Sequence, residues 1–360
     1  MSRLIHRANL PIHSHPRDLR LDAGGGDYAV VAGNPDSLSP RRGHLRRAEW
    51  LRVAYGIYRA RLDTPSALGD LRGWQLVLPE SAAFTHLTGA LVRRWWLPPL
   101  PADPPVFVGM SNDDPRPRRP GLIVCRHTRP GTSSEVAGLR VAEAPEILLA
   151  AARDLGLIDL VVLADAALQL GECTVADLSR VAGHRRRGAP ALRRALPYVD
   201  PRSESARESI LRLLHQICDV PVEPQYEVRD TDGFLRARAD LRITGTRRLP
   251  EYDGEAHRHS RQHAKDLTRE RQLQDLGWQR YGYNSGVVLH NGLSVLRDAD
   301  SALGRVHSPE RIRAWYRLLG ESLFTPAGTA RLSARWELAA VGAHVTGQRL
   351  QLAATGSCSL

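Results

Sequence analysis

The sequence is poor in the features that mark several common classes of protein. Its four cysteines form no C-x-x-C pair, which argues against a zinc site or a disulfide framework and favours a reducing cytoplasm. No apolar core of roughly 7–15 residues follows a basic start. The most apolar run, Leu155 to Leu170, is interrupted by Asp159 and Asp165. We therefore expect neither secretion nor a membrane span.

Motifs for nucleophilic catalysis and for phosphate loops are missing as well. No G-x-S-x-G occurs, and the glycine run at 24–26 is not followed by Lys-Ser/Thr. His257, His259, His263 and Glu255 are close in sequence, but their spacing does not place three imidazoles on one helix face. Structural zinc is therefore not expected.

Lysine is nearly absent, since Lys265 is the only one, and arginine supplies the rest of the positive charge. The 50 basic residues exceed the 39 acidic ones, for a net charge of +11. A surplus of this size favours polyanionic partners such as nucleic acid, and the planar guanidinium suits phosphate. Charge alone predicts binding and says nothing of chemistry.

The length of 360 residues exceeds one average domain and predicts two domains with tails. Residues 1–38 have no sustained pattern, so we expect them to be mobile. Residues 39–200 read as an α+β module, residues 201–305 as an α/β domain with a central mixed sheet flanked by helices, and residues 306–360 as a variable tail with one possible helix. The fold class predicted for the whole chain is α/β, or α+β overall.

In the first module the pattern predicts a short basic helix over 40–47 and a hairpin over 50–58. A helix capped by Ser81 should follow, and then strands near 106–108 and 121–124. Three more helices are expected between Pro145 and about residue 183, the third capped by Thr174.

The second module predicts a helix, three strands, a helix and a strand, in that order. Ser205 or Ser203 caps the first helix, in which Glu208 lies at the edge of the buried side and could face a cleft. The remaining elements are expected at 226–228, 234–243, 249–253, 260–276 and 278–283, with later helices at 292–303 and after Pro309.

Acidic groups concentrate inside these strands. Asp240 shares the polar face of its strand with Arg238 and Arg242, and Glu251 and Asp253 project together from the next. If the two strands pair, three carboxylates converge, which is costly without a counter-ion. Mg²⁺ or Mn²⁺ would serve and would suit phosphodiester hydrolysis. The alternative is a solvated, salt-bridged surface ending in an Asp-Gly turn.

Nearby residues could complete such a site. His257 has a suitable pKa to act as the base. Basic residues on the predicted helix are ordinarily a solvated face, but beside a nuclease cleft they could hold DNA phosphates. They are Arg258, Arg261, Lys265 and Arg269.

Several short motifs from 205 to 278, among them Ala239-Asp240-Leu241 and Glu251-Tyr252-Asp253-Gly254, recur in the order seen in a known branch of nucleases. The chain here resembles the actinobacterial, very-short-patch-repair-like branch of the restriction-endonuclease-like fold, whose superfamily pattern is PD-(D/E)xK. The resemblance implies that Asp240 and Glu251 bind the metal and that Glu208 belongs to the site. Asp253 stands where the superfamily has lysine, so His257, Lys265 or a metal-bound water network would activate water.

Residues 39–200 more loosely resemble the winged-helix antitoxins of abortive-infection systems, which bind operator DNA or counter a toxin. The first resemblance implies a metal-dependent DNA endonuclease, and the cysteine usage favours the cytoplasm. The alternative is a non-catalytic DNA-binding regulator or antitoxin, with a cognate toxin as partner and a degenerate nuclease domain. Pro250, which cannot donate in a strand ladder, keeps that alternative open.

Overall fold

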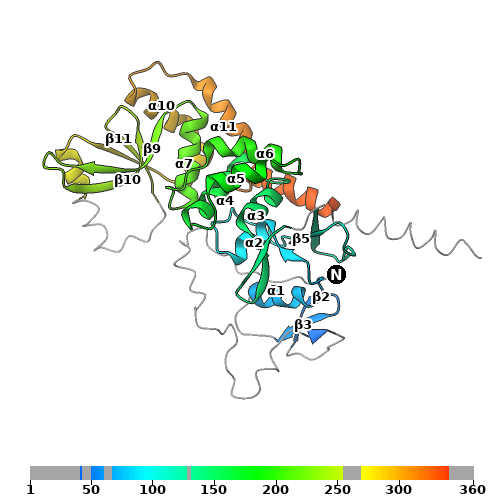
Figure 1. Ribbon diagram of the computed structural model, residues 1–360. Coiled ribbons are helices and arrows are strands. Elements are labelled where there is room, and N and C mark those ends of the chain that lie inside the picture. Colours follow the sequence, from blue (N-terminus) through cyan, green and yellow to red (C-terminus); the bar gives the residue numbers. More distant parts are fainter. Residues whose placement is uncertain (1–40, 43–49, 61–66, 128–130, 254–268, 340–360) are drawn as a thin grey trace, which may run out of the picture. The chain divides into compact units, whose positions relative to one another are not determined.

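The computed structural model describes residues 41–42, 50–60, 67–127, 131–253 and 269–339 and shows an α/β protein (Figure 1). Contacts divide the chain into one unit of Met1–Trp95, Pro99–Asp154 and Ala330–Leu360 and a second of Trp96–Pro98 and Leu155–Thr329. Residues 155–200, expected in the first domain, thus group with the second unit. The reason is that their longest helix packs on the helix that carries Glu208.

The first unit is built on a mixed five-stranded sheet in the order β6-β5-β4-β8-β7. β5 runs parallel to β6 and β4 parallel to β8, while the β4–β5 and β7–β8 pairs are antiparallel. Its strands and helices are α1 (Ala67–Gln75), β4 (Ala83–Phe84), α2 (His86–Val92), β5 (Val106–Ser111), β6 (Leu122–His127), β7 (Ser133–Val136), β8 (Leu139–Ala142) and α3 (Ala144–Ala151).

A small sheet precedes these elements, in the order β1-β3-β2, with β1 at Arg41–Arg42, β2 at Trp50–Ala54 and β3 at Ile57–Ala60. The β2–β3 hairpin confirms the expectation over 50–58, and Gly56 turns it with a φ of 69°. The helix expected over 40–47 is wrong at Arg41–Arg42, which pair as a strand with β3. Residues 43–49 lie outside the described residues.

The helix predicted to start at Ser81 begins later. Ala83 and Phe84 form β4, which pairs with β5 and β8, and α2 starts at His86 after Thr85. The apolar residues that we interpreted as the start of a helix face belong to a sheet. Phe84 is buried there between its two partner strands. Tertiary pairing overrides a short periodic signal here.

The second unit begins with a helical layer. Its helices are α4 (Leu157–Gln169), α5 (Val175–Ala182), α6 (Ala189–Ala195), η2 (Leu196–Tyr198) and α7 (Ala206–Ile217). As predicted, Thr174 caps α5, in a capping box with Asp177, and Ser205 caps α7, accepting the backbone N–H of Glu208. Among the described helices, none has the length and apolar character needed to cross a membrane.

Four strands follow, β9 (Val222–Arg229), β10 (Leu235–Ile243), β11 (Arg248–Tyr252) and β12 (Gln279–Tyr283). β9 and β10 form an antiparallel ladder, and β11 and β12 a parallel one. Residues 269–275 are helical, and Gly277 follows with a φ of 74°. The predicted order of helix, three strands, helix and strand is confirmed in the described residues, and α7 packs against β9, β10 and β11 (Figure 1).

Helices end the described chain. They are α9 (Ser285–His290), α10 (Gly292–Ala302), η3 (Pro309–Arg311) and α11 (Ile312–Leu319). A further helix over 326–339 was not predicted, because the segment is rich in Ala, Gly and Thr and has weak periodicity. It is nevertheless anchored by Leu332 and Trp336, which are buried.

A candidate acidic site between diverging strands

Asp240 lies where β10 and β11 run side by side without sharing a ladder. Its Oδ2 accepts a hydrogen bond of 2.9 Å from the backbone N–H of Tyr252. Backbone N–H groups two residues apart point to the same edge of a strand, so Pro250 turns its nitrogen toward this same gap. The proline therefore costs β11 no bond in its ladder with β12, and the strand runs through it.

Negative charge accumulates around Asp240. Burial, and then the neighbouring charge of Glu208, raise the pKa of Asp240 to about 7, with Glu251 adding to the rise. One hydrogen bond between described residues reaches this carboxylate, and no cation pairs with it directly there. Of the three carboxylates expected to converge, Glu251 acts on the pKa of Asp240 and Asp253 is not among the causes of the shift, whereas Glu208 is.

Glu208 is held at the start of α7 by neutral donors. Its carboxylate accepts from the backbone N–H of Glu204 (2.9 Å), the Ser205 hydroxyl (2.9 Å) and Nε2 of Gln225 (2.8 Å). Burial raises the pKa of Glu208. Gln225 has a φ of 54°, an uncommon conformation for a strand residue that the contact with Glu208 helps to hold.

Glu251 and Asp253 are paired with arginines. Glu251, 4% exposed, accepts from Nη2 of Arg269 on Oε1 (2.8 Å) and from Nε of Arg280 on Oε2 (2.5 Å). Nη2 of Arg280 also donates to Oδ1 of Asp253 (2.6 Å). Glu251 and Asp253 therefore project to the same side, as the alternation predicts, and meet the same guanidinium.

Gly282 makes room for this arrangement. It lies opposite Glu251 in the parallel ladder, and a Cβ placed on it would come within 1.7 Å of Oδ2 of Asp253. No side chain could occupy that position without displacing the carboxylate. The bare backbone of β12 is thus part of what holds Asp253 against Arg280.

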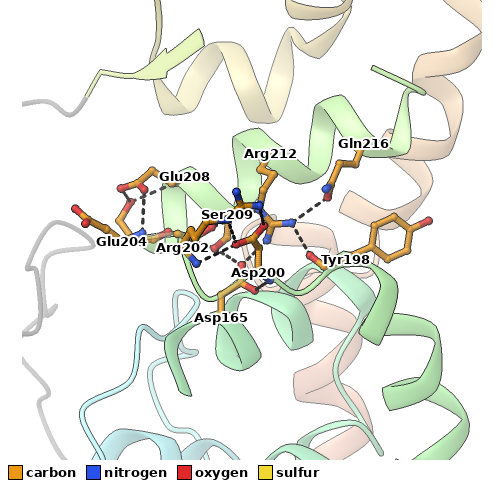
Figure 2. Close-up of polar contacts among 11 residues, drawn as sticks. Asp165, Tyr198, Asp200, Arg202, Glu204, Glu208, Ser209, Arg212 and Gln216 are labelled. Atoms are coloured by element: carbon orange, nitrogen blue, oxygen red, sulfur yellow. Dashed lines mark hydrogen bonds and ion pairs between the residues drawn. The ribbon is translucent and has the colours of Figure 1, made fainter. Parts of the chain in front are cut away.

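A second group of acids and arginines lies behind Glu208, where α7 meets α4 (Figure 2). Arg212 and Asp165 are both fully buried and joined by an ion pair of 2.5 Å. Asp165 also accepts from the Ser209 hydroxyl (2.6 Å) and from the backbone N–H of Asp200 (2.8 Å). Because Ser209 adjoins Glu208, this network fixes the start of α7.

Arg212 makes further contacts in the same network. It donates to the carbonyl of Tyr198 (2.5 Å) and to Oε1 of Gln216 (3.0 Å) (Figure 2). Burial raises the pKa of Asp165 to about 6, even though the Arg212 charge lowers it. The apolar run Leu155 to Leu170 therefore contains the buried helix α4, and its Asp165 forms an ion pair with Arg212, which is distant in sequence.

The donor set of the acidic site fits a hard divalent cation, but only in part. Its candidate ligands are all carboxylate oxygens, which Mg²⁺ and Mn²⁺ prefer, and Asp240 has no ion pair among the described residues. Glu251 is already neutralised by two guanidinium groups. Within the described ranges, no group of three or more His, Cys, Asp or Glu side chains has the geometry of a metal site.

Four of the predicted residues cannot be placed. His257, Arg258, Arg261 and Lys265 lie outside the described residues. Arg269 is described, and besides Glu251 it contacts the backbone carbonyl of Arg238 at 2.8 Å. Its role as a phosphate-binding residue stays a prediction.

Two residues of the site were missed by the sequence reading. Arg280 and Gly282 are two apart on β12 and so share a face, and the alternation of residues 278–283 could have placed them there. What the sequence does not reveal is that β12 lies parallel to β11 in the register that brings this face to Glu251.

The fold and this acidic, arginine-paired site define an α/β protein with relatives in mycobacteria. "Uncharacterized protein MT2308" of Mycobacterium tuberculosis (strain CDC 1551 / Oshkosh) and "Uncharacterized protein Rv2248" of strain ATCC 25618 / H37Rv are each 30% identical to it over 234 residues. The match covers 63% of this chain and 83% of each relative. The chain therefore belongs to the same family as these two proteins. No family model and no solved structure matches it.

Proposed function

We propose that the protein is a metal-dependent DNA endonuclease with a restriction-endonuclease-like second unit. The observation that carries the proposal is the environment of Asp240, where burial and the charges of Glu208 and Glu251 raise the pKa to about 7. A half-buried acid whose pKa is raised by desolvation and by neighbouring acids is a candidate for a functional site. The order of α7, β9 to β11, the helix at 269–275 and β12 supports the fold assignment.

In this proposal Asp240 and Glu251 hold Mg²⁺ or Mn²⁺, and Glu208 and Asp253 orient the site. The bound ion would lower the pKa of a water molecule and screen charge on the phosphate oxygens. Arg269 supplies a positive charge next to the acids, and the net charge of +11 favours DNA as the substrate. We assign the base to His257 and the location to the cytoplasm.

The test compares nicking of plasmid DNA by wild type and Asp240→Ala with Mg²⁺ or Mn²⁺. Asp232→Ala is the matched control, because Asp232 is an exposed acid in the β9–β10 turn. We expect Asp240→Ala to be slower by roughly a hundredfold or more, the size of effect seen when one transition-state-stabilising group is lost. Equal nicking by both proteins, or by neither, would overturn the enzyme proposal.

A second candidate function is a non-catalytic DNA-binding regulator or antitoxin-like protein. The pairing of Glu251 with Arg269 and Arg280 favours it, because these contacts neutralise a carboxylate that a nuclease needs for metal. The β2–β3 hairpin is compatible with a wing, and a cognate toxin would then be the partner. This candidate predicts DNA binding without metal that Asp240→Ala leaves unchanged.

A further inference from the structure

Arg280 holds Glu251 of β11 and Asp253, which directly follows this strand, with one guanidinium. Its Nε lies 2.5 Å from Oε2 of Glu251 and its Nη2 2.6 Å from Oδ1 of Asp253. Arg269 takes the remaining oxygen of Glu251 at 2.8 Å. Each oxygen of Glu251 therefore accepts from a guanidinium in the free protein, and a cation approaching this carboxylate meets two positive charges.

The arginine at this position is partly exposed. The side chain of Arg280 is 28% exposed, whereas Glu251 is almost fully buried. Arg280 also lines a hollow of about 220 Å³, together with Gln274, Trp278, Tyr281 and one acid, Glu270. Arg280 thus contacts two acids and lines an open space.

The chemistry of the guanidinium indicates which ligand would draw it away. Its planar fork matches a phosphate as well as it matches a carboxylate, with two parallel hydrogen bonds to either. A phosphodiester in the hollow would compete with Glu251 and Asp253 for the same N–H donors. Asp240, which has no direct cationic partner among the described residues, would then face one more unpaired acid.

This inference rests on the proposed function. We propose that Arg280 is a phosphate-binding residue that blocks Glu251 and Asp253 in the absence of DNA. When DNA binds, its guanidinium leaves the two acids and binds a backbone phosphate. DNA binding then frees Glu251 for the divalent cation. The two ligands must help one another, because coupling between binding sites is reciprocal. The ion pairs of Glu251 were given above as support for a non-catalytic protein. Under this proposal the same ion pairs prevent metal binding until DNA is bound.

The experiment measures Mn²⁺ affinity of the full-length protein without DNA, by calorimetry, for wild type, Arg280→Gln and Asp240→Ala. We expect Arg280→Gln to bind Mn²⁺ at least about fivefold more tightly than wild type, the lower end of usual coupling between sites. Its affinity for a short DNA duplex without metal should fall, with a salt dependence weaker by about one phosphate contact. Arg236→Gln, which removes an arginine from β10 remote from Glu251, should leave the Mn²⁺ affinity unchanged.

The outcomes separate this proposal from the proposed function. If wild type binds Mn²⁺ through Asp240 but Arg280→Gln binds it no more tightly, the block is wrong and the metal site stands. If neither wild type nor Arg280→Gln binds Mn²⁺, both proposals fail. Should Arg280→Gln not fold, Arg280→Lys keeps the charge but cannot contact both acids. A smaller tightening is then expected, and an unchanged affinity would overturn the block.

Discussion

Two groups of acids and arginines in the second unit differ in how completely their carboxylates are paired. Asp165 is paired with Arg212 and bonded to Ser209 and to the backbone of Asp200, so that its oxygens are fully used (Figure 2). Asp240 is only half-buried and has one backbone hydrogen bond and two acidic neighbours. In the first arrangement each buried charge has its partner, while in the second the acids repel one another, which a ligand could relieve.

The largest expected change in stability comes from removing the partner of Asp165. Replacing Arg212 by Met should lower the free energy of unfolding by about 3–5 kcal/mol, because a buried carboxylate is left without its partner. Urea unfolding of wild type and variant measures the loss. The double variant Asp165→Leu with Arg212→Met should recover most of it, and a single-variant loss below about 1 kcal/mol would contradict the buried pair.

An intermediate effect tests the Asp240 side. The folded-state pKa of about 7 lies above the ordinary value of 3.8, so the native state keeps its proton between about pH 4 and pH 7 where the unfolded state has lost it. Wild type must therefore lose stability, relative to Asp240→Asn, as the pH rises through this window. Without metal at pH 8, Asp240→Asn should be more stable by about 1–3 kcal/mol, given 1.4 kcal/mol per pKa unit and some screening by solvent.

Urea unfolding at pH 4 and pH 8 checks this prediction, with Asp232→Asn as the control for loss of an exposed acid. The difference between Asp240→Asn and wild type should nearly vanish at pH 4, and Mn²⁺ should raise the melting temperature of wild type alone. A metal-free loss of stability in Asp240→Asn at pH 8 would show that Asp240 is a structural partner like Asp165.

The smallest effect concerns Asp253 and Gly282. Each of Asp253→Ala and Gly282→Ala should cost less than about 1 kcal/mol, because Asp253 is 45% exposed and half-exposed ion pairs contribute little. A double-mutant cycle by urea unfolding checks the contact. Once Asp253 is alanine, adding Gly282→Ala should cost almost nothing more, and an additive result would mean that the two residues do not constrain each other.

Much of the second unit could be predicted from local signals. Alternation along β10 placed Asp240 on the polar face, and a serine three residues before Glu208 predicted the cap of α7. Arg212 shows where such signals stop. It lies between Leu211 and Leu213 and resembles an ordinary solvated helix residue, yet it is fully buried, because Asp165, 47 residues earlier, supplies its partner. Pairings across that distance leave no periodic trace in the sequence.

The acidic site was also predictable only as far as local sequence patterns reach. Which carboxylates share a face follows from the strand period, and Glu251 and Asp253 do meet one guanidinium. That the guanidinium belongs to Arg280 depends on the register of a parallel pair closed by a long crossover, which short-range patterns do not encode. The shared face of Glu251 and Asp253 was foreseeable, and the identity of their counter-ion was not.

The helix at 326–339 has a consequence for the order of synthesis. Trp336 packs edge-on against His86 and Phe107, and Arg335 pairs with Asp154, so the first unit includes residues near both ends of the described chain. The second unit, apart from three residues, is one continuous segment, Leu155–Thr329. A ribosome therefore completes the second unit before it delivers the last pieces of the first. We therefore expect the first unit to finish folding only after residues 330–339 have been made.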